Sequence, residues 1–330
     1  MQIDIEQLRV LMAEVCRRTA VPEDKINLVV DHYLVGELRG KPTHGIAKFC
    51  FECRFFSERD GSPHVVREHG SLAIIDGRRE VGPVSALYAV EVAVSKAREF
   101  GVGMVGVLNT QRYGVLAPWT ERIAREGFIG LVMNTSRPDS TVEGGRTPFL
   151  GVNPLSFAFP TSQTPFVVDM STTKAPMGQL WESRRGNTPL PENCFVDGHG
   201  EFTEDPHLAE AAVVFGGHKG FAVSLLVQIL TGSLFGFPMS RDVTSTWETG
   251  YAFMAIDPSF GGALAGFPAH NSRLVEVMEG VVTREGHPLR LPGQQSEARM
   301  SAALKSGSVQ LDDALHKRLC ARAAGDLELD

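Results

Sequence analysis

The stretch Gly101-Val102-Gly103-Met104-Val105-Gly106 decides which fold class is open to this chain of 330 residues. Its spacing matches G-x-G-x-x-G, the glycine fingerprint of dinucleotide-binding domains, in which a strand runs into the glycines and a helix begins after them. Here the order is reversed, because apolar residues at helical spacing cover residues 85–100 and a strand pattern covers residues 102–108. No helix start is therefore predicted where a pyrophosphate would bind, and we interpret the match as chance.

Helical and strand patterns alternate along the rest of the chain. Asp4, followed by Gln7, predicts a helix start near the N-terminus, and Pro22 opens a second helix that ends near Arg39. Further strands are predicted at residues 72–76, 128–133, 152–160, 166–170 and 251–256, with a helix near 119–125. The chain is long enough for two domains, or for one domain with a large excursion.

Composition and charge narrow the class of partner. The net charge is −7, and lysines and arginines do not cluster, so neither nucleic acid nor an anionic membrane is expected. The apolar run from Phe221 to Phe237 is short and interrupted by polar residues, which favours a buried core helix over a membrane span. Five cysteines without a secretory signal fit a reducing, cytoplasmic compartment. A small molecule is the expected ligand.

Cys50 and Cys53 form a C-x-x-C pair. A zinc site needs a second pair at matching spacing, and the other cysteines supply none. We therefore interpret the two residues as semi-buried helix thiols, and we expect no metal site.

The strongest candidate for chemistry is the stretch Arg39-Gly40-Lys41-Pro42-Thr43-His44-Gly45-Ile46-Ala47-Lys48-Phe49. Thr43 can cap a helix over residues 46–55, which would place His44 in its first turn. Lys48 follows His44 at i,i+4, so an acid/base group and a cation would share one helix face. That pairing suits a substrate with a carboxylate beside a reducible carbon. A histidine at such a place can equally be a surface residue.

Two other segments can bind anions or hydroxyl groups. Residues 169–173 place Asp169, Ser171 and Thr172 at a strand end, where they could bond ribose or phosphate oxygens, or simply cap a helix. Lys219 lies among glycines directly before the apolar helix, where free backbone N–H groups favour negative charge.

Taken together, these motifs resemble the malate/L-lactate dehydrogenase family of non-Rossmann NAD(P)H oxidoreductases. That family includes ureidoglycolate and sulfolactate dehydrogenases, diketogulonate reductase and the piperideine- and pyrroline-carboxylate reductases. The resemblance spans nearly the whole chain and rests on residues 43–45 with Lys48, 109–110, 150–155, 169–172, 217–220 and 290–293.

The resemblance implies an α/β fold: a mixed, largely antiparallel sheet wrapped by helices, with a helical part built from both termini. We expect residues 1–70 and 285–330 to form that helical, substrate-side and dimer part, and residues 71–284 to form the NAD(P)H-binding part with a helical excursion. The resemblance also implies homodimers and an NAD(P)H cofactor, with NADPH favoured.

The resemblance implies roles for single residues as well. His44 would donate or accept the proton, and Lys48 would contact the substrate carboxylate. We also expect Thr43 and Arg112 to bind the substrate. The expected cofactor-binding residues are Asn153, Asp169, Met170, Ser171, Thr172, Lys219 and Arg290.

Two positions depart from the family pattern. Lys48 stands where the family usually has Arg, and Arg112 stands where its Asn-Ser-x-His signature has His. Lys keeps the charge but loses the bidentate fork. Arg112 stays protonated, so it cannot be a second acid/base group, but it can clamp a carboxylate and leave proton transfer to His44.

These residues predict an enzyme that passes hydride to or from the carbon α to a carboxylate, in a 2-oxo or 2-hydroxy acid. One alternative is a cyclic ketimine reductase, because a protonated imine arrives already activated and needs a single acid. Another is a family member that binds a nucleotide or metabolite without turnover, which the missing second histidine would allow.

Overall fold

The computed structural model describes residues 1–261 and 266–328. In it, α4 (Gly82–Phe100) ends at Gly101, whose φ of 80° is the left-handed conformation that closes many helices. β4 (Val102–Leu108) begins at the next residue. The predicted order of helix, glycines and strand is confirmed, so these glycines do not form a dinucleotide-binding turn.

The same glycines have a packing role instead. A Cβ at Gly103 would lie 2.0 Å from the carbonyl oxygen of Ala93 in α4, and a Cβ at Gly106 would lie 2.5 Å from the ring of Phe235. Both distances are far below van der Waals contact. Glycine therefore lets α4 and the segment around Phe235 approach β4 closely.

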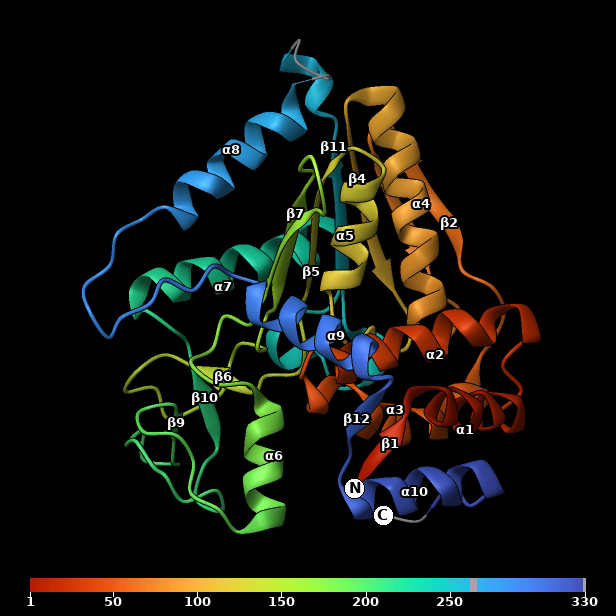
Figure 1. Cartoon of the computed structure of the whole chain (residues 1–330), viewed down its shortest axis with the longest axis vertical. Coiled ribbons are helices and arrows are strands. Elements are labelled where there is room, and N and C mark those ends of the chain that lie inside the picture. The colour runs from red at the N-terminus through yellow and green to blue at the C-terminus, as the bar shows by residue number, and fades with distance from the viewer. Residues whose placement is uncertain (262–265, 329–330) are drawn as a thin grey trace.

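β4 belongs to a seven-stranded sheet in the order β2-β3-β4-β11-β5-β7-β8 (Figure 1). β3 and β4 run parallel, and every other neighbouring pair is antiparallel, which confirms the mixed, largely antiparallel sheet. β11 pairs with β4 and β5, although both precede it by more than 100 residues. The other strands are β2 (His64–His69), β3 (Leu72–Asp76), β5 (Ile129–Asn134), β7 (Leu155–Phe159), β8 (Phe166–Met170) and β11 (Tyr251–Ile256).

Helices cover both faces of this sheet. α4 and α5 (Ala117–Arg125) pack on one face, where Val105, Val132 and Phe253 enter their core. α7 (His218–Thr231) packs on the other face, against Met104 and Met133. The alternation of Met104 and Val105 between the two cores is the period of two expected of a strand buried on both faces.

The two ends of the chain form one helical part, as predicted. β1 (Gln2–Asp4) pairs with β12 (Ser308–Gln310), and neither strand was predicted from the sequence. Asp4 caps the following helix through the N–H groups of Glu6 and Gln7. The shared core joins α1 (Ile5–Arg18), α2 (Glu23–Leu38), α3 (Ile46–Glu52) and α10 (Asp313–Ala324).

The remaining elements lie around this body (Figure 1). A small sheet has the order β6-β10-β9, and none of its strands was predicted. These peripheral elements are β6 (Ser140–Thr141), β9 (Phe195–Val196), β10 (Ala211–Val213), α6 (Met177–Gly186), α8 (Phe267–Glu279) and α9 (Gln294–Ser306).

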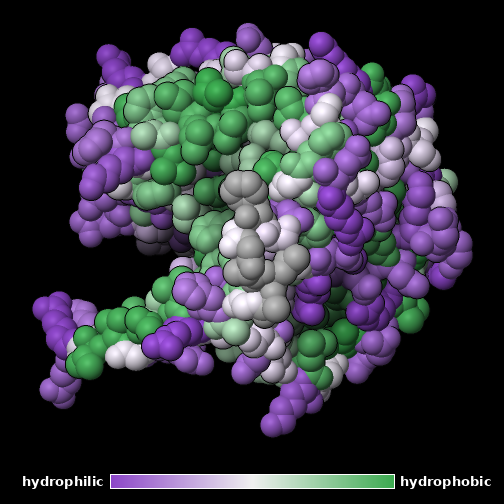
Figure 2. All heavy atoms as spheres, turned by 90° about the horizontal axis from the view of Figure 1, so that it is seen from above, coloured by the Kyte–Doolittle hydropathy of each residue, from purple (hydrophilic) through white to green (hydrophobic). Residues whose placement is uncertain are grey.

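α7 differs from the buried core helix that the sequence predicts. By length and composition alone, residues 218–235 could cross a membrane, but only 33% of that window is buried. Ser224 and Gln228 face the protein, whereas Leu225 and Leu226 are 44% and 54% exposed. The polar residues Ser224, Gln228 and Thr231 are buried and these two leucines are exposed, so the usual expectation that apolar residues face the core points to the wrong side of this helix. Figure 2 shows apolar side chains gathered on the upper side of the body, with an arm projecting beside them.

Candidate active site

The stretch around His44 folds as a 3-10 turn followed by a helix. η1 (Pro42–His44) ends at Gly45, and α3 begins at Ile46. Thr43 does not cap α3, so that prediction is wrong: the carboxylate of Glu37 accepts from the N–H of Ile46 at 3.1 Å instead. Pro42 starts the turn, and the extra residue Gly45 puts His44 just before the helix.

Close backbone contacts hold His44 in place. A Cβ at Gly36 of α2 would lie 2.5 Å from the carbonyl oxygen of His44. A Cβ at Gly178 of α6 would lie 2.5 Å from the Thr43 side chain. Both glycines therefore allow an approach that any side chain would block. The site lies where α2, η1 and the start of α6 meet.

The His44 imidazole is half-buried among charged groups. The hydroxyl of Thr43 lies 3.0 Å from its Nδ1. Burial, and then the Lys48 ammonium, lower the pKa of His44 from 6.5 to about 4, while Asp169 opposes this shift and Lys41 adds to it. His44 is therefore a neutral imidazole at pH 7, which can accept a proton.

Asp169 lies beside this histidine, at the end of β8. Its Oδ2 is 3.0 Å from the Nζ of Lys41 and accepts from the N–H of Ala117 at 3.3 Å. This ion pair joins residues 128 positions apart. Nothing in the sequence near Lys41 indicates this ion pair, and for Asp169 the sequence suggested a cofactor contact or a helix cap.

Lys48 is paired with a carboxylate of its own helix. Its Nζ lies 2.7 Å from the Oε1 of Glu52, and the hydroxyl of Tyr33 donates to Oε2 of the same residue at 2.6 Å. Burial lowers the pKa of Lys48, and Glu52 opposes that shift. The Glu52 carboxylate thus offsets much of the positive charge with which Lys48 was expected to bind the substrate. The i,i+4 spacing of Lys48 and Glu52 is the sequence feature that indicates this ion pair.

Arg112 lines a small pocket next to this pair. Phe51, Glu52, Phe55, Gln111, Thr246 and Trp247 form the other walls. Among residues 1–261 and 266–328, no carboxylate lies within ion-pair distance of Arg112, although it acts electrostatically on Lys48 and Asp139. An unpaired guanidinium in an aromatic pocket is suited to bind a carboxylate with two parallel hydrogen bonds.

Two further arginines stack on the walls of this pocket. The guanidinium of Arg54 lies 4.6 Å from the ring centre of Phe51, and that of Arg79 lies 5.2 Å from Trp247. Cation–π contacts of this kind hold a positive charge near the aromatic face. The surroundings of the pocket are therefore cationic in a protein whose net charge is −7.

His32 is a buried neighbour that the sequence reasoning missed. Its ring stacks on Trp119 with centres 4.8 Å apart. Burial, with smaller contributions from Arg122, His44 and Lys48, lowers the pKa of His32 to about 3, and a backbone hydrogen bond at Tyr113 opposes the shift. It therefore stays neutral, packed between Trp119 and the backbone of Gly114. Its position among the apolar residues of α2 is the sequence feature that indicates a buried histidine.

Two of the predicted cofactor segments meet at the end of β8. The N–H of Phe215 donates to the carbonyl of Thr172 at 3.0 Å, which brings Ser171 and Thr172 beside the glycines before α7. Gly216 and Gly217 both have positive φ, and Lys219 is exposed at the start of that helix. The Thr172 hydroxyl is committed to the carbonyl of Val152, at 3.0 Å.

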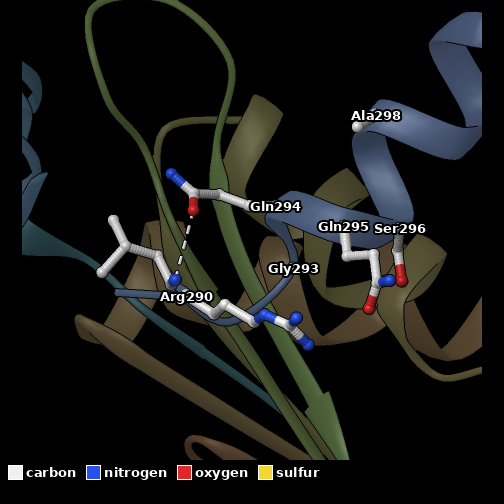
Figure 3. A pocket seen from close by; sticks show the side chains of 7 residues that line it. Arg290, Gly293, Gln294, Gln295, Ser296 and Ala298 are labelled. Atoms are coloured by element: carbon white, nitrogen blue, oxygen red, sulfur yellow. Dashed lines mark hydrogen bonds between the residues drawn. The ribbon is translucent and has the colours of Figure 1, made fainter. Parts of the chain in front are cut away.

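Arg290 approaches the same strand from the C-terminal side. A Cβ at Gly293 would lie 2.4 Å from the carbonyl oxygen of Val167 in β8, and Gly293 has a φ of +83°. Figure 3 shows the pocket at the start of α9 that Arg290, Gly293 and Gln294 line. Exposed cations and open N–H groups on both sides of β8 fit a phosphate-bearing cofactor.

Asn153 and Met170 are placed differently. Asn153 is fully buried, and its amide donates to the carbonyl of Ser224 at 3.0 Å, so its side chain ties α7 to the strand start. Met170 is 38% exposed at the end of β8. The cofactor roles of both residues remain predictions.

Cys50 and Cys53 are buried more completely than predicted. Burial raises the pKa of Cys50 to about 12 and that of Cys53 to about 11. Both thiols therefore stay protonated and are poor nucleophiles. In the described part of the chain, no group of three His, Cys, Asp or Glu side chains could hold a metal ion.

The site combines a neutral imidazole with a guanidinium that has no ion-pair partner among the described residues, and the glycine motif of the chain is not that of a Rossmann domain. The chain belongs to the malate/L-lactate dehydrogenase family, whose model matches residues 3–320. It is 35% identical to the L-sulfolactate dehydrogenase of Methanothermobacter thermautotrophicus over 271 residues, which cover 78% of this chain and 80% of that protein. It is 30% identical to the malate dehydrogenase of Pyrococcus abyssi, over 93% and 90% of the two chains.

Solved structures show the same fold. Sulfolactate dehydrogenase from Methanocaldococcus jannaschii matches with a TM-score of 0.88 at 26% identity, covering 100% of this chain and 98% of that one. The Δ1-piperideine-2-carboxylate reductase from Pseudomonas syringae matches with a TM-score of 0.83 at 23% identity, covering 98% and 99%. The fold class and the family that the sequence motifs predict are confirmed.

Proposed function

We propose that this chain is an NAD(P)H-dependent enzyme that interconverts a 2-oxo acid and the corresponding 2-hydroxy acid. The observation that carries the proposal is that buried Lys48 interacts electrostatically with both His44 and Arg112, so an imidazole and a guanidinium share one charged neighbour. One group exchanges a proton, and the other fixes a carboxylate. A reacting carbon next to the carboxylate would then lie within reach of the imidazole.

His44 and Arg112 have separate roles in the proposed reaction. In the oxidative direction neutral His44 accepts the proton of the hydroxyl group, and in the reductive direction protonated His44 returns it to the oxygen. Arg112 binds the carboxylate and thereby fixes the orientation of the substrate. A bound nicotinamide supplies or accepts the hydride. The aromatic side chains of Phe55 and Trp247 line the pocket beside Arg112.

The cofactor is expected between β8, the start of α7 and the start of α9. Lys219 and Arg290 are both exposed there, and a second cation suits the additional phosphate of NADPH, which we propose as the preferred form. Most cofactor contacts then come from residues 71–284, and the helical part from both termini supplies the substrate side. We place the enzyme in the cytoplasm, in keeping with its five free cysteines.

A fluorescence titration with NADH and NADPH, followed by turnover on a panel of 2-oxo acids, tests the function. We expect binding of at least one cofactor and turnover of at least one oxo acid, such as oxaloacetate or pyruvate. Cofactor binding without turnover of any compound would instead support a member that binds without catalysis.

Cyclic ketimines such as piperideine-2-carboxylate are the second candidate substrates. The observation that favours them is Arg112, which replaces an acid/base residue with a permanent cation. His44 alone then moves protons, and a protonated imine needs no proton delivered to an oxygen. Including a cyclic imine in the panel separates the two substrates by their relative kcat/KM.

We propose a homodimer in which the exposed face of α7 is covered. Leu225, Leu226 and Ile229 form this apolar α7 face, and within α8 only Asn271 is buried. Uncovered apolar surface of this kind is typical of subunit interfaces. The inference also rests on the homodimers of the family that the chain resembles.

Leu226→Glu should convert the dimer to a monomer, because it places a charge in a desolvated apolar contact. Size-exclusion chromatography with light scattering at micromolar concentration measures this mass. Leu208→Glu is the matched control, since Leu208 is 59% exposed and lies outside the α7 face. A Leu226→Glu variant with the mass of a dimer would exclude this face as the interface.

A further inference from the structure

Lys41 is the charged residue near His44 for which the proposed mechanism has no use. It stands three residues before His44, and its carbonyl accepts from the His44 N–H at 2.9 Å. Its ammonium lies 3.0 Å from the Oδ2 of Asp169. The two side chains are 30% and 12% exposed, so this pair is better shielded from water than an ordinary surface ion pair.

Asp169 is held at this place from two sides. Lys41 approaches one side, and the N–H of Ala117 donates to the same oxygen at 3.3 Å from the start of α5. The backbone contact would remain if the Lys41 side chain were removed. The carboxylate would then stay near His44 with less of its charge neutralised.

The titratable groups around His44 come from four segments. α3 brings Lys48, which Glu52 offsets, and α2 brings His32, which is neutral. β8 brings Asp169, and the segment before η1 brings Lys41. Among the described residues, Asp169 is thus the carboxylate that acts on His44 most directly, and Lys41 is its partner.

We propose that Lys41 is a positioning residue which, by pairing with Asp169, sets the pH range over which His44 exchanges its proton. The inference deepens the proposed function and rests on His44 as its acid/base group. The pair keeps the histidine neutral at lower pH than a lone Asp169 would allow. Lys41 thereby tunes the histidine without touching the substrate.

The sign of the effect follows from the charges. An unpaired carboxylate stabilises imidazolium, so removing Lys41 should raise the proton affinity of His44. In the oxidative direction the enzyme needs neutral His44, and activity falls as the pH drops through its pKa. That acid limb should move to higher pH in the variant. In the reductive direction, which needs imidazolium, activity should persist to higher pH.

The test is a pH titration of His44 in the Lys41→Met variant. NMR signals of the histidine ring carbons report the protonation, and the His44→Ala variant assigns the signal of His44. We expect the pKa of His44 to rise by about one unit, in the range produced by a nearby opposite charge. Lys41→Arg, which keeps the pair, should titrate like the native chain. Lys25→Met is the matched control, because Lys25 pairs with Glu80 at 2.9 Å with exposures of 22% and 3%.

The NMR titration does not depend on turnover, so it tests the role of Lys41 separately from the proposed function. An unchanged His44 titration in Lys41→Met would overturn the role of Lys41, even if the enzyme reduces oxo acids as proposed. A raised pKa in a protein that turns over no substrate would support that role and reject the proposed function. In an active enzyme, the acid limb of kcat/KM should shift by the same amount as the NMR titration.

Discussion

His44→Ala should lower kcat by about two to four orders of magnitude, the range typical for loss of a general acid or base. The proton of the hydroxyl group would have no acceptor on the protein, and no other neutral, accessible base stands beside His44 among the described residues, since His32 is buried and its pKa is lowered. Cofactor affinity should hold, because the proposed cofactor segments lie along β8, α7 and α9. Stopped-flow turnover and a fluorescence titration with NADPH measure the two quantities.

His199→Ala serves as the control for this variant, because His199 is exposed in a turn far along the chain from η1. It should keep native turnover. Among the described residues, Thr43 is the hydrogen-bond partner of the His44 side chain, so His44→Ala should also fold normally. A kcat for His44→Ala within a few-fold of the native value would remove His44 from proton transfer.

Arg112→Ala should raise the KM for the oxo acid by about ten- to a hundredfold, which corresponds to the 1.5–3 kcal/mol of a hydrogen bond to a charged group. The carboxylate would lose its planar clamp, and Lys48 cannot replace it fully because Glu52 holds its ammonium at 2.7 Å. Initial rates over a range of oxo acid, at saturating cofactor, give KM and kcat separately.

Two further variants, Arg112→Lys and Arg79→Ala, serve as comparisons for Arg112→Ala. Arg112→Lys keeps the charge but loses the fork, so its KM should lie between those of the native enzyme and Arg112→Ala. Arg79→Ala removes a guanidinium that stacks on Trp247 but does not line the pocket, and it should change KM little. If Arg112→Ala left KM unchanged, the carboxylate would have to bind elsewhere.

The candidate site was only partly predictable. The i,i+4 relation of His44 and Lys48 is a local property of the chain, and both side chains do act on each other. The Glu52 partner of Lys48 was equally local, but its effect depends on burial, which the spacing does not show. The contact between Lys41 and Asp169 spans 128 positions, and no local pattern indicates which distant carboxylate a lysine will meet.

The sequence by itself determined most of the helices, though not α6 or α8, most strands of the large sheet and the reversed glycine motif, because periodicity, caps and turn residues act over a few positions. Only the tertiary structure decided that β11 inserts between β4 and β5, that β1 pairs with β12, and that one face of α7 stays exposed. Those outcomes depend on packing between distant segments. The same holds for the charges around His44, because only the fold brings Asp169 to Lys41.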